Sequence, residues 1–449
     1  MTFFRTLGVV SVAALALGAC STLSKVGSLS PFHGKQAAKQ AAKGNRIPVV
    51  ALNDQLHVAD ALKGQDFLLP PPALQAEWPL PGGTPGQSVE HVDAAPAFAI
   101  AWRRSIGAPS SRQKHVTATP IVAGGRVFVM DGVSTVSAHD AVTGAQIWRN
   151  NIMPKSKRDH EAWGGGVAFA DGKVYASSGF REVVQLDAAT GRVGWRTRTE
   201  APLHDAPTVF GGRVFVADVN DEMLALETTS GAQLWTYQAL TEPARMLGAS
   251  SAAVDNETVV ASFASGELVA LRAANGNELW NASLSKASRT NALSEIRDIV
   301  GRPVIYKSDV FAVSHSDVFA AVDLRTGAPR WSLPLSAITS PWPAGDAVFV
   351  VDLAGQVICV ARDSGQVYWI RDLNAGIKDK KKRAYWSSPI LASNRLITVS
   401  SHGEAVAINP KTGAVLARLR LGSGALIGPI AAGGLVYVVS DTAQLIAIR

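Results

Sequence analysis

Cysteine, charge and long apolar runs are all scarce in this chain of 449 residues. Its two cysteines exclude a disulfide-dense scaffold and a multi-cysteine zinc site, and no CxxC or CxxCH spacing offers a redox dithiol or covalent haem. Charged residues make up 18% of the chain and leave a net charge of +7, without the long basic stripe typical of a nucleic-acid interface. The sequence contains neither an HExxH nor a GxSxG motif, so we assign no catalytic or metal-binding residues.

The one apolar run that stands out lies near the amino terminus and resembles a lipoprotein leader. Residues 7–17 are too few to span a bilayer, and they end in the tetrad Leu17-Gly18-Ala19-Cys20. That tetrad resembles the lipobox of bacterial lipoproteins, which implies a signal peptide over residues 1–19 and acylation of Cys20. An ordinary secretory leader is the alternative. The residue after Cys20 is Ser21 and not Asp. By resemblance to the sorting rule of bacterial lipoproteins, this favours the outer membrane, on its periplasmic face.

Residues 20–97 have the composition of a lipid-anchored, basic and proline-rich tether. Five basic residues precede the first acid, Asp54, and suit either anionic headgroups or a solvated linker. The run Pro70-Pro71-Pro72 cannot sustain a helix or a central strand. Trp78 is an exception in this polar stretch, and we expect it to pin the arm to the main body.

A repeat fills the chain from residue 98 to residue 449. Its mark is a Thr-Gly, Ser-Gly or Asn-Gly pair whose Gly lies four residues before a Trp, and the six such tryptophans are Trp148, Trp195, Trp235, Trp280, Trp331 and Trp369. Trp102 lies upstream without such a pair, and a seventh pair at Thr412-Gly413 is followed by Ala417 instead of Trp. Successive tryptophans are 38 to 51 residues apart. Periods of this length indicate propeller blades or helical arrays.

The content of each repeat favours blades. Short β-branched and aromatic runs such as Val127-Phe128-Val129 follow Gly, and each repeat offers four strands rather than a helix. Asp140 and the Gly of the next turn suit a hairpin, since the carboxylate can accept backbone N–H groups and Gly tolerates the left-handed conformation. The Trp then falls on the outermost strand, where its ring can wedge between neighbouring blades.

Counting the repeats predicts an all-β protein, an eight-bladed propeller of four-stranded antiparallel blades. The last stretch supplies three strands, and Phe98-Ala99-Ile100-Ala101-Trp102 completes that blade from the amino-terminal side. Such closure leaves no open sheet edge. The junction at Ala417 should be the weakest or be filled by another side chain, and Cys359 should be a buried small hydrophobe.

The motif A-x-D-x-x-T-G-x-x-x-W, from Ala138 to Trp148, resembles the repeat of pyrroloquinoline-quinone-type propellers. With the lipobox and the blade number, the chain resembles the BamB family, lipoprotein B subunits of the outer-membrane β-barrel assembly machinery. That resemblance implies a non-enzymatic scaffold without a cofactor. It would bind POTRA domains of the barrel-inserting, BamA-like subunit, act beside the other lipoproteins of the machinery, and aid insertion of outer-membrane proteins. A quinone-dependent dehydrogenase and a ligand-sensing periplasmic propeller are the alternatives.

The resemblance also implies a partner surface on two loops between central blades, residues 238–248 and 283–301. The expected partner-binding residues are Arg245, Met246, Leu247, Leu293, Ile296, Arg297 and Asp298. In the first loop Leu247 takes the place of the family's Arg, and in the second Val300 replaces one family Asp, whereas Asp298 matches the other. Ile299 adds to the apolar side chains of the second loop, a mixture suited to an apolar contact rimmed by charge.

Overall fold

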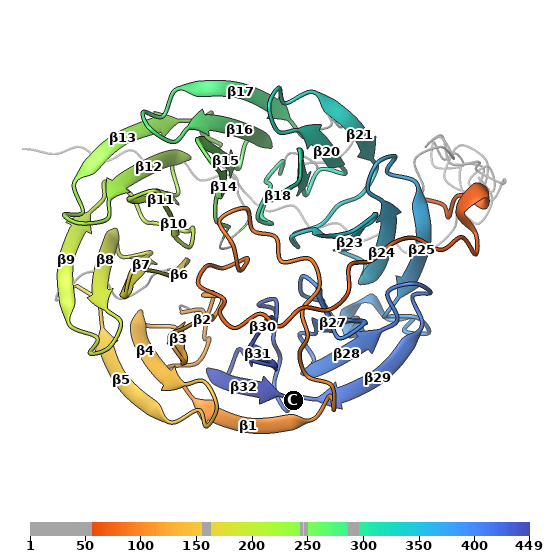
Figure 1. Ribbon diagram of the computed structural model, residues 1–449, viewed down its shortest axis with the longest axis horizontal. Helices are drawn as coiled ribbons and strands as arrows, with labels where there is room; N and C mark the ends of the chain where they lie inside the picture. Colours follow the sequence, from red (N-terminus) through yellow and green to blue (C-terminus); the bar gives the residue numbers. More distant parts are fainter. Residues whose placement is uncertain (1–55, 113, 155–162, 243–245, 247–249, 286–295) are drawn as a thin grey trace, which may run out of the picture. The chain divides into compact units, whose positions relative to one another are not determined.

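The computed structural model describes residues 56–112, 114–154, 163–242, 246, 250–285 and 296–449, and the expected leader and Cys20 lie outside them. The described residues form eight four-stranded antiparallel sheets, arranged radially around a central axis (Figure 1). The predicted eight-bladed β-propeller is confirmed. The helices of the described residues are two 3₁₀ turns, η2 (Asp60–Leu62) and η4 (Lys380–Lys382), and neither is long or apolar enough to cross a membrane.

In every blade except the last, the four strands are ordered from the centre of the ring to its rim as they follow one another in the chain. Blade 1 is β2 (Ile121–Ala123), β3 (Arg126–Met130), β4 (Thr135–Asp140) and β5 (Gln146–Asn151). Blade 2 is β6 (Gly165–Ala170), β7 (Lys173–Ser178), β8 (Glu182–Asp187) and β9 (Val193–Arg198). Blade 3 is β10 (Thr208–Phe210), β11 (Arg213–Ala217), β12 (Glu222–Glu227) and β13 (Gln233–Gln238). Blade 4 is β14 (Ala253–Asp255), β15 (Thr258–Ser262), β16 (Glu267–Arg272) and β17 (Glu278–Ser283).

The second half of the ring continues the same pattern. Blade 5 is β18 (Val304–Tyr306), β19 (Asp309–Val313), β20 (Phe319–Asp323) and β21 (Pro329–Leu333). Blade 6 is β22 (Trp342–Ala344), β23 (Ala347–Val351), β24 (Gln356–Ala361) and β25 (Val367–Asp372). Blade 7 is β26 (Ile390–Ala392), β27 (Arg395–Val399), β28 (Glu404–Ile408) and β29 (Val415–Arg420). Blade 8 is β30 (Ile430–Ala432), β31 (Leu435–Val439), β32 (Gln444–Ile448) and, from the other end of the chain, β1 (Ile100–Ser105).

The ring closes as the sequence predicts. Strand β1 pairs antiparallel with β32 from Ile100 opposite Ile448 to Ser105 opposite Gln444, with a bulge after Ile100. Ala99 and Arg449 extend the ladder by exchanging two backbone hydrogen bonds of 3.0 and 2.8 Å. Because the closing strand comes from the opposite end of the described chain, unfolding of either end must open the ring.

Each rim tryptophan lies over the turn glycine of the next blade. The seven glycines, Gly144, Gly191, Gly231, Gly276, Gly327, Gly365 and Gly413, have φ between +67° and +73°. A Cβ added at any of them would fall 2.5 to 2.8 Å from the ring of the tryptophan in the preceding blade. The glycine is therefore required twice, for its left-handed backbone and for the space that the indole occupies. Asp140 caps its turn as expected, accepting from the Val142 and Thr143 amides at 3.1 and 2.8 Å.

Six of these indoles also donate a hydrogen bond to the next blade, and Trp102 does not. Trp235, for example, donates to the carbonyl of Ala273 at 3.0 Å, whereas the Nε1 of Trp102 is buried without a partner among the described residues. The equivalent carbonyl, that of Ala141, instead accepts from the Tyr437 hydroxyl at 2.9 Å. Blade 8 thus closes onto blade 1 with a tyrosine in the role that tryptophan has elsewhere.

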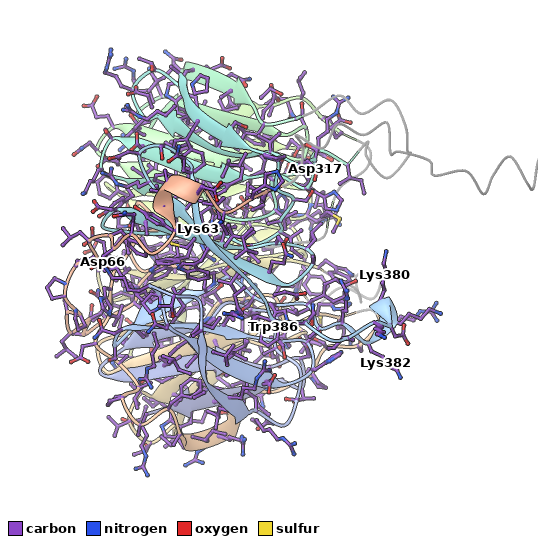
Figure 2. All side chains as sticks on the ribbon, turned by 90° about the vertical axis from the view of Figure 1, so that its right-hand side faces the viewer. Lys63, Asp66, Asp317, Lys380, Lys382 and Trp386 are labelled. Atoms are coloured by element: carbon purple, nitrogen blue, oxygen red, sulfur yellow. The ribbon has the colours of Figure 1, made fainter. Side chains whose placement is uncertain are left out.

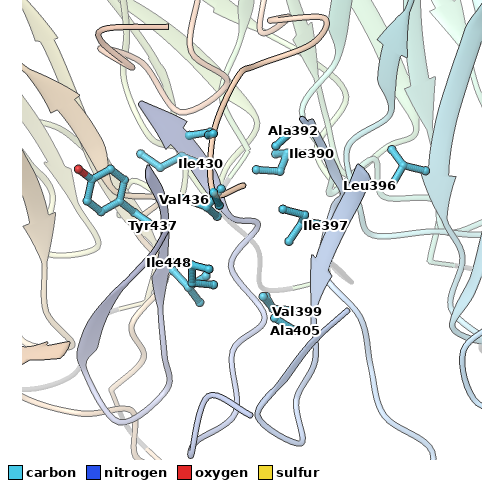
Figure 3. Close-up of a cluster of buried hydrophobic side chains, with 14 of the residues drawn as sticks. Ile390, Ala392, Leu396, Ile397, Val399, Ala405, Ile430, Val436, Tyr437 and Ile448 are labelled. Atoms are coloured by element: carbon cyan, nitrogen blue, oxygen red, sulfur yellow. The ribbon is translucent and has the colours of Figure 1, made fainter. Parts of the chain in front are cut away.

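The hydrophobic core lies between the blades, where the strands of each blade face the next. Figure 3 shows the interface of blades 7 and 8, with Ile397 and Val399 on one side and Val436 and Ile448 on the other. All four side chains are at most 1% exposed. Cys359 is fully buried in blade 6, and burial raises the pKa of its thiol, so the expectation of a small structural hydrophobe is confirmed.

A segment before β1 winds across the centre of the ring of blades (Figure 1). We call residues 75–95 the strap. It is hydrogen-bonded to all eight blades, through Val122, Phe169, Thr208, Val254, Ile305, Trp342, Leu391 and Gly433. The sequence predicted a tether as far as residue 97, whereas the structure packs the strap on the propeller, because its backbone groups find partners at the ends of the inner strands.

Trp78 anchors the strap, as the sequence predicts. Its backbone exchanges two hydrogen bonds with Val122 at 2.7 and 2.8 Å, and its ring, 1% exposed, stacks on Trp342 at 6.2 Å between centroids. Further upstream, Val58 pairs with Val367 at the edge of blade 6, and Phe67 lies against Tyr368 at 4.4 Å. Residues 56–97 therefore belong to the propeller body in the described part of the chain.

Candidate partner-binding surface

Two loops between central blades lie against each other. The first, residues 239–252, leads from β13 to β14, and the second, residues 284–303, leads from β17 to β18. The backbone amide of Met246 donates to the Asp298 carboxylate at 2.8 Å. This bond joins the two loops, which the sequence named separately.

The Asp298 side of this junction is firmly held. Asp298 is 8% exposed, and its carbonyl accepts from the His315 amide of blade 5 at 2.9 Å. The backbone of Arg297 lies so close to Gly266 that a Cβ there would be 2.9 Å from the Arg297 carbonyl oxygen. The second loop is thus supported by hairpin turns of blades 4 and 5, so its geometry depends on the blades beneath it.

Asp221 supports the first loop, and sequence reasoning did not name it. Its carboxylate accepts from the Glu242 amide at 3.4 Å and from the Ala264 amide at 3.1 Å, which links blade 3 to blade 4. A positive φ of 62° at Asp221 marks a tight turn before β12. The available signal was the polar pair Asn220-Asp221 between two apolar strands, a pattern typical of any hairpin.

The residues of this surface differ in what they offer to a partner. Arg297 is exposed, Met246 and Ile296 are partly exposed, and Asp298 is turned inward. Ile299, which the sequence placed in the apolar mixture, is 1% exposed and packs in the core beside Leu284. Expected partner residues Arg245, Leu247 and Leu293 lie outside the described residues.

The depression between the two loops is small. Its volume is about 10 Å³, and its walls include His204, Met246 and Asp298. That is room for about one water molecule, and not for an organic ligand.

The described residues offer no ready metal centre. No group of three or more His, Cys, Asp or Glu side chains within them is arranged to hold an ion. The perturbed carboxyls have structural causes: burial raises the pKa of Asp352 to about 6, while hydrogen bonds from Thr190 and Lys173 lower the pKa of Asp187 to about 2. Neither lies in the junction of the two loops.

A family model described as outer membrane protein assembly factor BamB matches residues 132–371 and 378–449. The chain belongs to the BamB family. It is 24% identical over 335 residues to the BamB of Shewanella oneidensis, which covers 73% of this chain and 82% of that protein. The BamB of Burkholderia pseudomallei is likewise 24% identical, over 334 residues, 74% of this chain and 83% of that protein.

Solved structures show the same fold. The BamB of Moraxella catarrhalis aligns with a TM-score of 0.65 at 19% identity, over 77% of this chain and 99% of that one. A quinohemoprotein alcohol dehydrogenase from Comamonas testosteroni aligns with a TM-score of 0.65 at 15% identity, over 84% of this chain and 80% of that one. The propeller fold is therefore shared by an assembly factor and by redox enzymes, and the fold alone does not decide the activity.

Proposed function

We propose that this BamB-family protein is a non-enzymatic scaffold of the outer-membrane β-barrel assembly complex. It is held on the periplasmic face of the outer membrane by acylated Cys20, and it binds POTRA domains of the barrel-inserting subunit. The relatives' names and the lipobox support this assignment. One observation carries the site: the hydrogen bond from Met246 to Asp298 joins the two loops into one surface across blades 3 to 5.

The residues divide into two roles on this surface. Arg297, Met246 and Ile296 face the partner and supply charge and apolar area, with Arg245, Leu247 and Leu293 beside them in sequence. Asp298 holds the two loops together rather than touching the partner, because its carboxylate accepts a backbone amide and its side chain is buried. A charge at the rim of an interface chiefly sets the association rate and its salt dependence.

A pull-down of the tagged full-length protein from solubilised outer membranes tests the scaffold. The barrel-inserting subunit is the expected partner, and Arg297→Glu should weaken its recovery about tenfold, equivalent to about 1.4 kcal/mol. Arg325→Glu is the matched control, since Arg325 is equally exposed but lies on the rim turn of blade 5. Recovery without the barrel-inserting subunit, or equal loss in both variants, would contradict the proposal.

The competing assignment as a quinone enzyme has a direct test. Purified protein is mixed with pyrroloquinoline quinone, calcium, an alcohol and an artificial electron acceptor. We expect no substrate-dependent dye reduction above that of the cofactor alone. Dye reduction that depends on both the protein and the alcohol would contradict the scaffold proposal and support a dehydrogenase.

A further inference from the structure

The inner strands of several blades begin around one hollow of the molecule. There the structure contains a cavity of about 530 Å³, lined by residues that precede the inner strands. No strap residue is among the residues that line this cavity. We call it the funnel.

One charged residue occupies a ring of otherwise small positions. In five blades the residue before the recurring Pro at the start of the inner strand lines the funnel, and these residues are Thr119, Arg302, Ser340, Ser388 and Gly428. Four are hydroxyl residues or glycine, and Arg302 is the exception. A position that is small in neighbouring blades and cationic in one is a local departure from the repeat, which indicates a specific role.

The backbone around Arg302 is fixed. Gly301 lies so close to blade 6 that a Cβ there would be 2.3 Å from the Thr339 carbonyl oxygen. The Arg302 amide donates to the Ser340 hydroxyl oxygen at 2.9 Å, and the Ser340 amide donates to the Ser388 hydroxyl oxygen at 2.8 Å. Both hydroxyls accept from the backbone, so each retains its own proton to donate into the funnel.

The guanidinium of Arg302 lacks a counter-ion in the described part of the chain. Its Nε is inaccessible to solvent and has no hydrogen-bond partner, and no described carboxylate lies within ion-pair distance. Burial alone lowers the pKa of Arg302 to about 10, so the group stays cationic at neutral pH. Arg302 as a whole is partly exposed, so only the inner part of its side chain is cut off from water, and a cation in this position attracts an anion.

The other charged groups of the funnel act on each other. Asp441 and His115 line the same cavity: burial raises the pKa of Asp441, and His115 lowers it, whereas burial lowers the pKa of His115, and Asp441 raises it. No ion pair joins Asp441 to Arg302 in the described part of the chain. The cation therefore remains available to an anion from outside.

The rest of the funnel wall and its approach define the ligand further. Val116, Ile338 and Ile427 supply apolar wall. Figure 2 shows Lys380 and Lys382 projecting from one face of the molecule, with Lys63 and Asp66 on the opposite side. A second cavity, lined in part by Trp386, shares Ile338, Ser388 and Leu426 with the funnel. Trp386 follows the basic turn η4 in the sequence.

We propose that the funnel binds a molecule with a carboxylate head and an apolar body. The carboxylate pairs with the Arg302 guanidinium and accepts from the Ser340 and Ser388 hydroxyls, while the apolar part lies against Val116 and Ile338. Arg presents a planar fork that matches a carboxylate at two points, and it is the side chain best suited to this recognition. The carboxylate can belong to a small organic acid or to the end of a peptide chain.

Thermal melting and calorimetry of the full-length protein test the site. The probes are N-acetylphenylalanine, its amide, inorganic phosphate, and a six-residue peptide that ends in free Phe. We expect the two carboxylates to raise the melting temperature and the amide and phosphate not to. Arg302→Gln should weaken carboxylate binding roughly 10- to 100-fold, the range expected for charged hydrogen bonds. Tighter binding of the peptide identifies a chain end as the ligand, and equal binding identifies a small acid.

Arg213→Gln is the matched control, because the Nε of Arg213 is also buried without a partner but lies on β11 outside the funnel. Without ligand, Arg302→Gln should melt at the same or a higher temperature, because the variant lacks the unpaired, partly buried charge. A purely structural role for Arg302 predicts the opposite shift. Absence of carboxylate binding, equal binding by Arg302→Gln, or equal stabilisation by phosphate overturns the proposal, and each leaves the partner surface on blades 3 to 5 untouched.

Discussion

The contact between rim tryptophan and turn glycine is the unit that repeats around the ring, and its energy can be measured by Gly276→Ala. Gly276 has a φ of +73°, and a Cβ there would be 2.6 Å from the ring of Trp235. The left-handed backbone costs an alanine about 1 to 2 kcal/mol. Displacing a packed ring costs about 1 to 3 kcal/mol more. The variant should therefore lose about 2 to 5 kcal/mol of unfolding free energy.

The chain offers a control that separates the two causes. Gly212 lies in blade 3 with a φ of +75°, and a Cβ there would meet no atom within 4 Å. Gly212→Ala should therefore lose only the backbone part, about 1 to 2 kcal/mol. Guanidinium unfolding followed by far-ultraviolet circular dichroism measures both variants against the natural protein.

A double variant completes the test. In a Trp235→Ala background the space above Gly276 is empty, so Gly276→Ala should cost about 1 to 2 kcal/mol, as at Gly212. Trp235→Ala itself should cost about 3 to 5 kcal/mol, because the buried ring leaves a cavity between blades 3 and 4. Equal losses at Gly276 and Gly212, or no coupling between Gly276 and Trp235, would refute the assignment of glycine to indole packing.

Two further variants examine a buried carboxyl and the strap. Burial holds the pKa of Asp352 at about 6, above its ordinary 3.8, so the folded state is penalised above pH 6 and relieved as the pH falls toward 3.8. Asp352→Asn keeps an acceptor for the Gln356 amide. Compared with the natural protein, the variant should be more stable by up to about 3 kcal/mol at pH 8 and no more stable at pH 4. A gain in stability that does not depend on pH would speak against burial of the carboxylate as its cause. Trp78→Ala should cost about 3 to 5 kcal/mol and speed hydrogen exchange of the Val122 amide, which donates to the Trp78 carbonyl. Leu74→Ala, at a side chain 69% exposed, should change neither, and unchanged exchange in Trp78→Ala would show that the strap is held elsewhere.

The fold could be predicted because its information is local and repeated. The turn pair followed by Trp at a fixed distance specifies strand, hairpin and rim position at once, and seven copies agree. The strap could not be predicted in the same way. It is held by backbone carbonyls, such as those of Pro79 and Gly86, and by scattered polar side chains such as that of Gln87, and neither set follows a repeat, so only Trp78 gave a signal.

The candidate surface was predictable as a region and not in its inner geometry. The family resemblance predicts both loops. The hydrogen bond between Met246 and Asp298 joins positions 52 residues apart, and no repeat in the sequence indicates it. For the same reason the inward turn of Ile299 could not be seen, since a loop lacks the alternation that assigns faces to a strand. Arg302 did carry a signal, as the charged member among the small residues before the inner-strand prolines, and it becomes meaningful once those residues are known to meet in the funnel.

The sequence leaves two expectations for the missing tryptophan at Ala417, a weak junction or one filled by another side chain, and the way in which blade 8 is built explains why the tryptophan is absent. A rim indole needs the glycine turn of the next blade, and that turn joins the third strand to the fourth. In blade 8 those strands are β32 and β1, which come from opposite ends of the described chain, so no turn and no glycine lie beside Ala417. The junction is bonded instead through Arg103, whose guanidinium donates to the Arg420 carbonyl at 3.3 Å. The loss of Trp in the seventh repeat is therefore a consequence of closing the ring with strands from both ends.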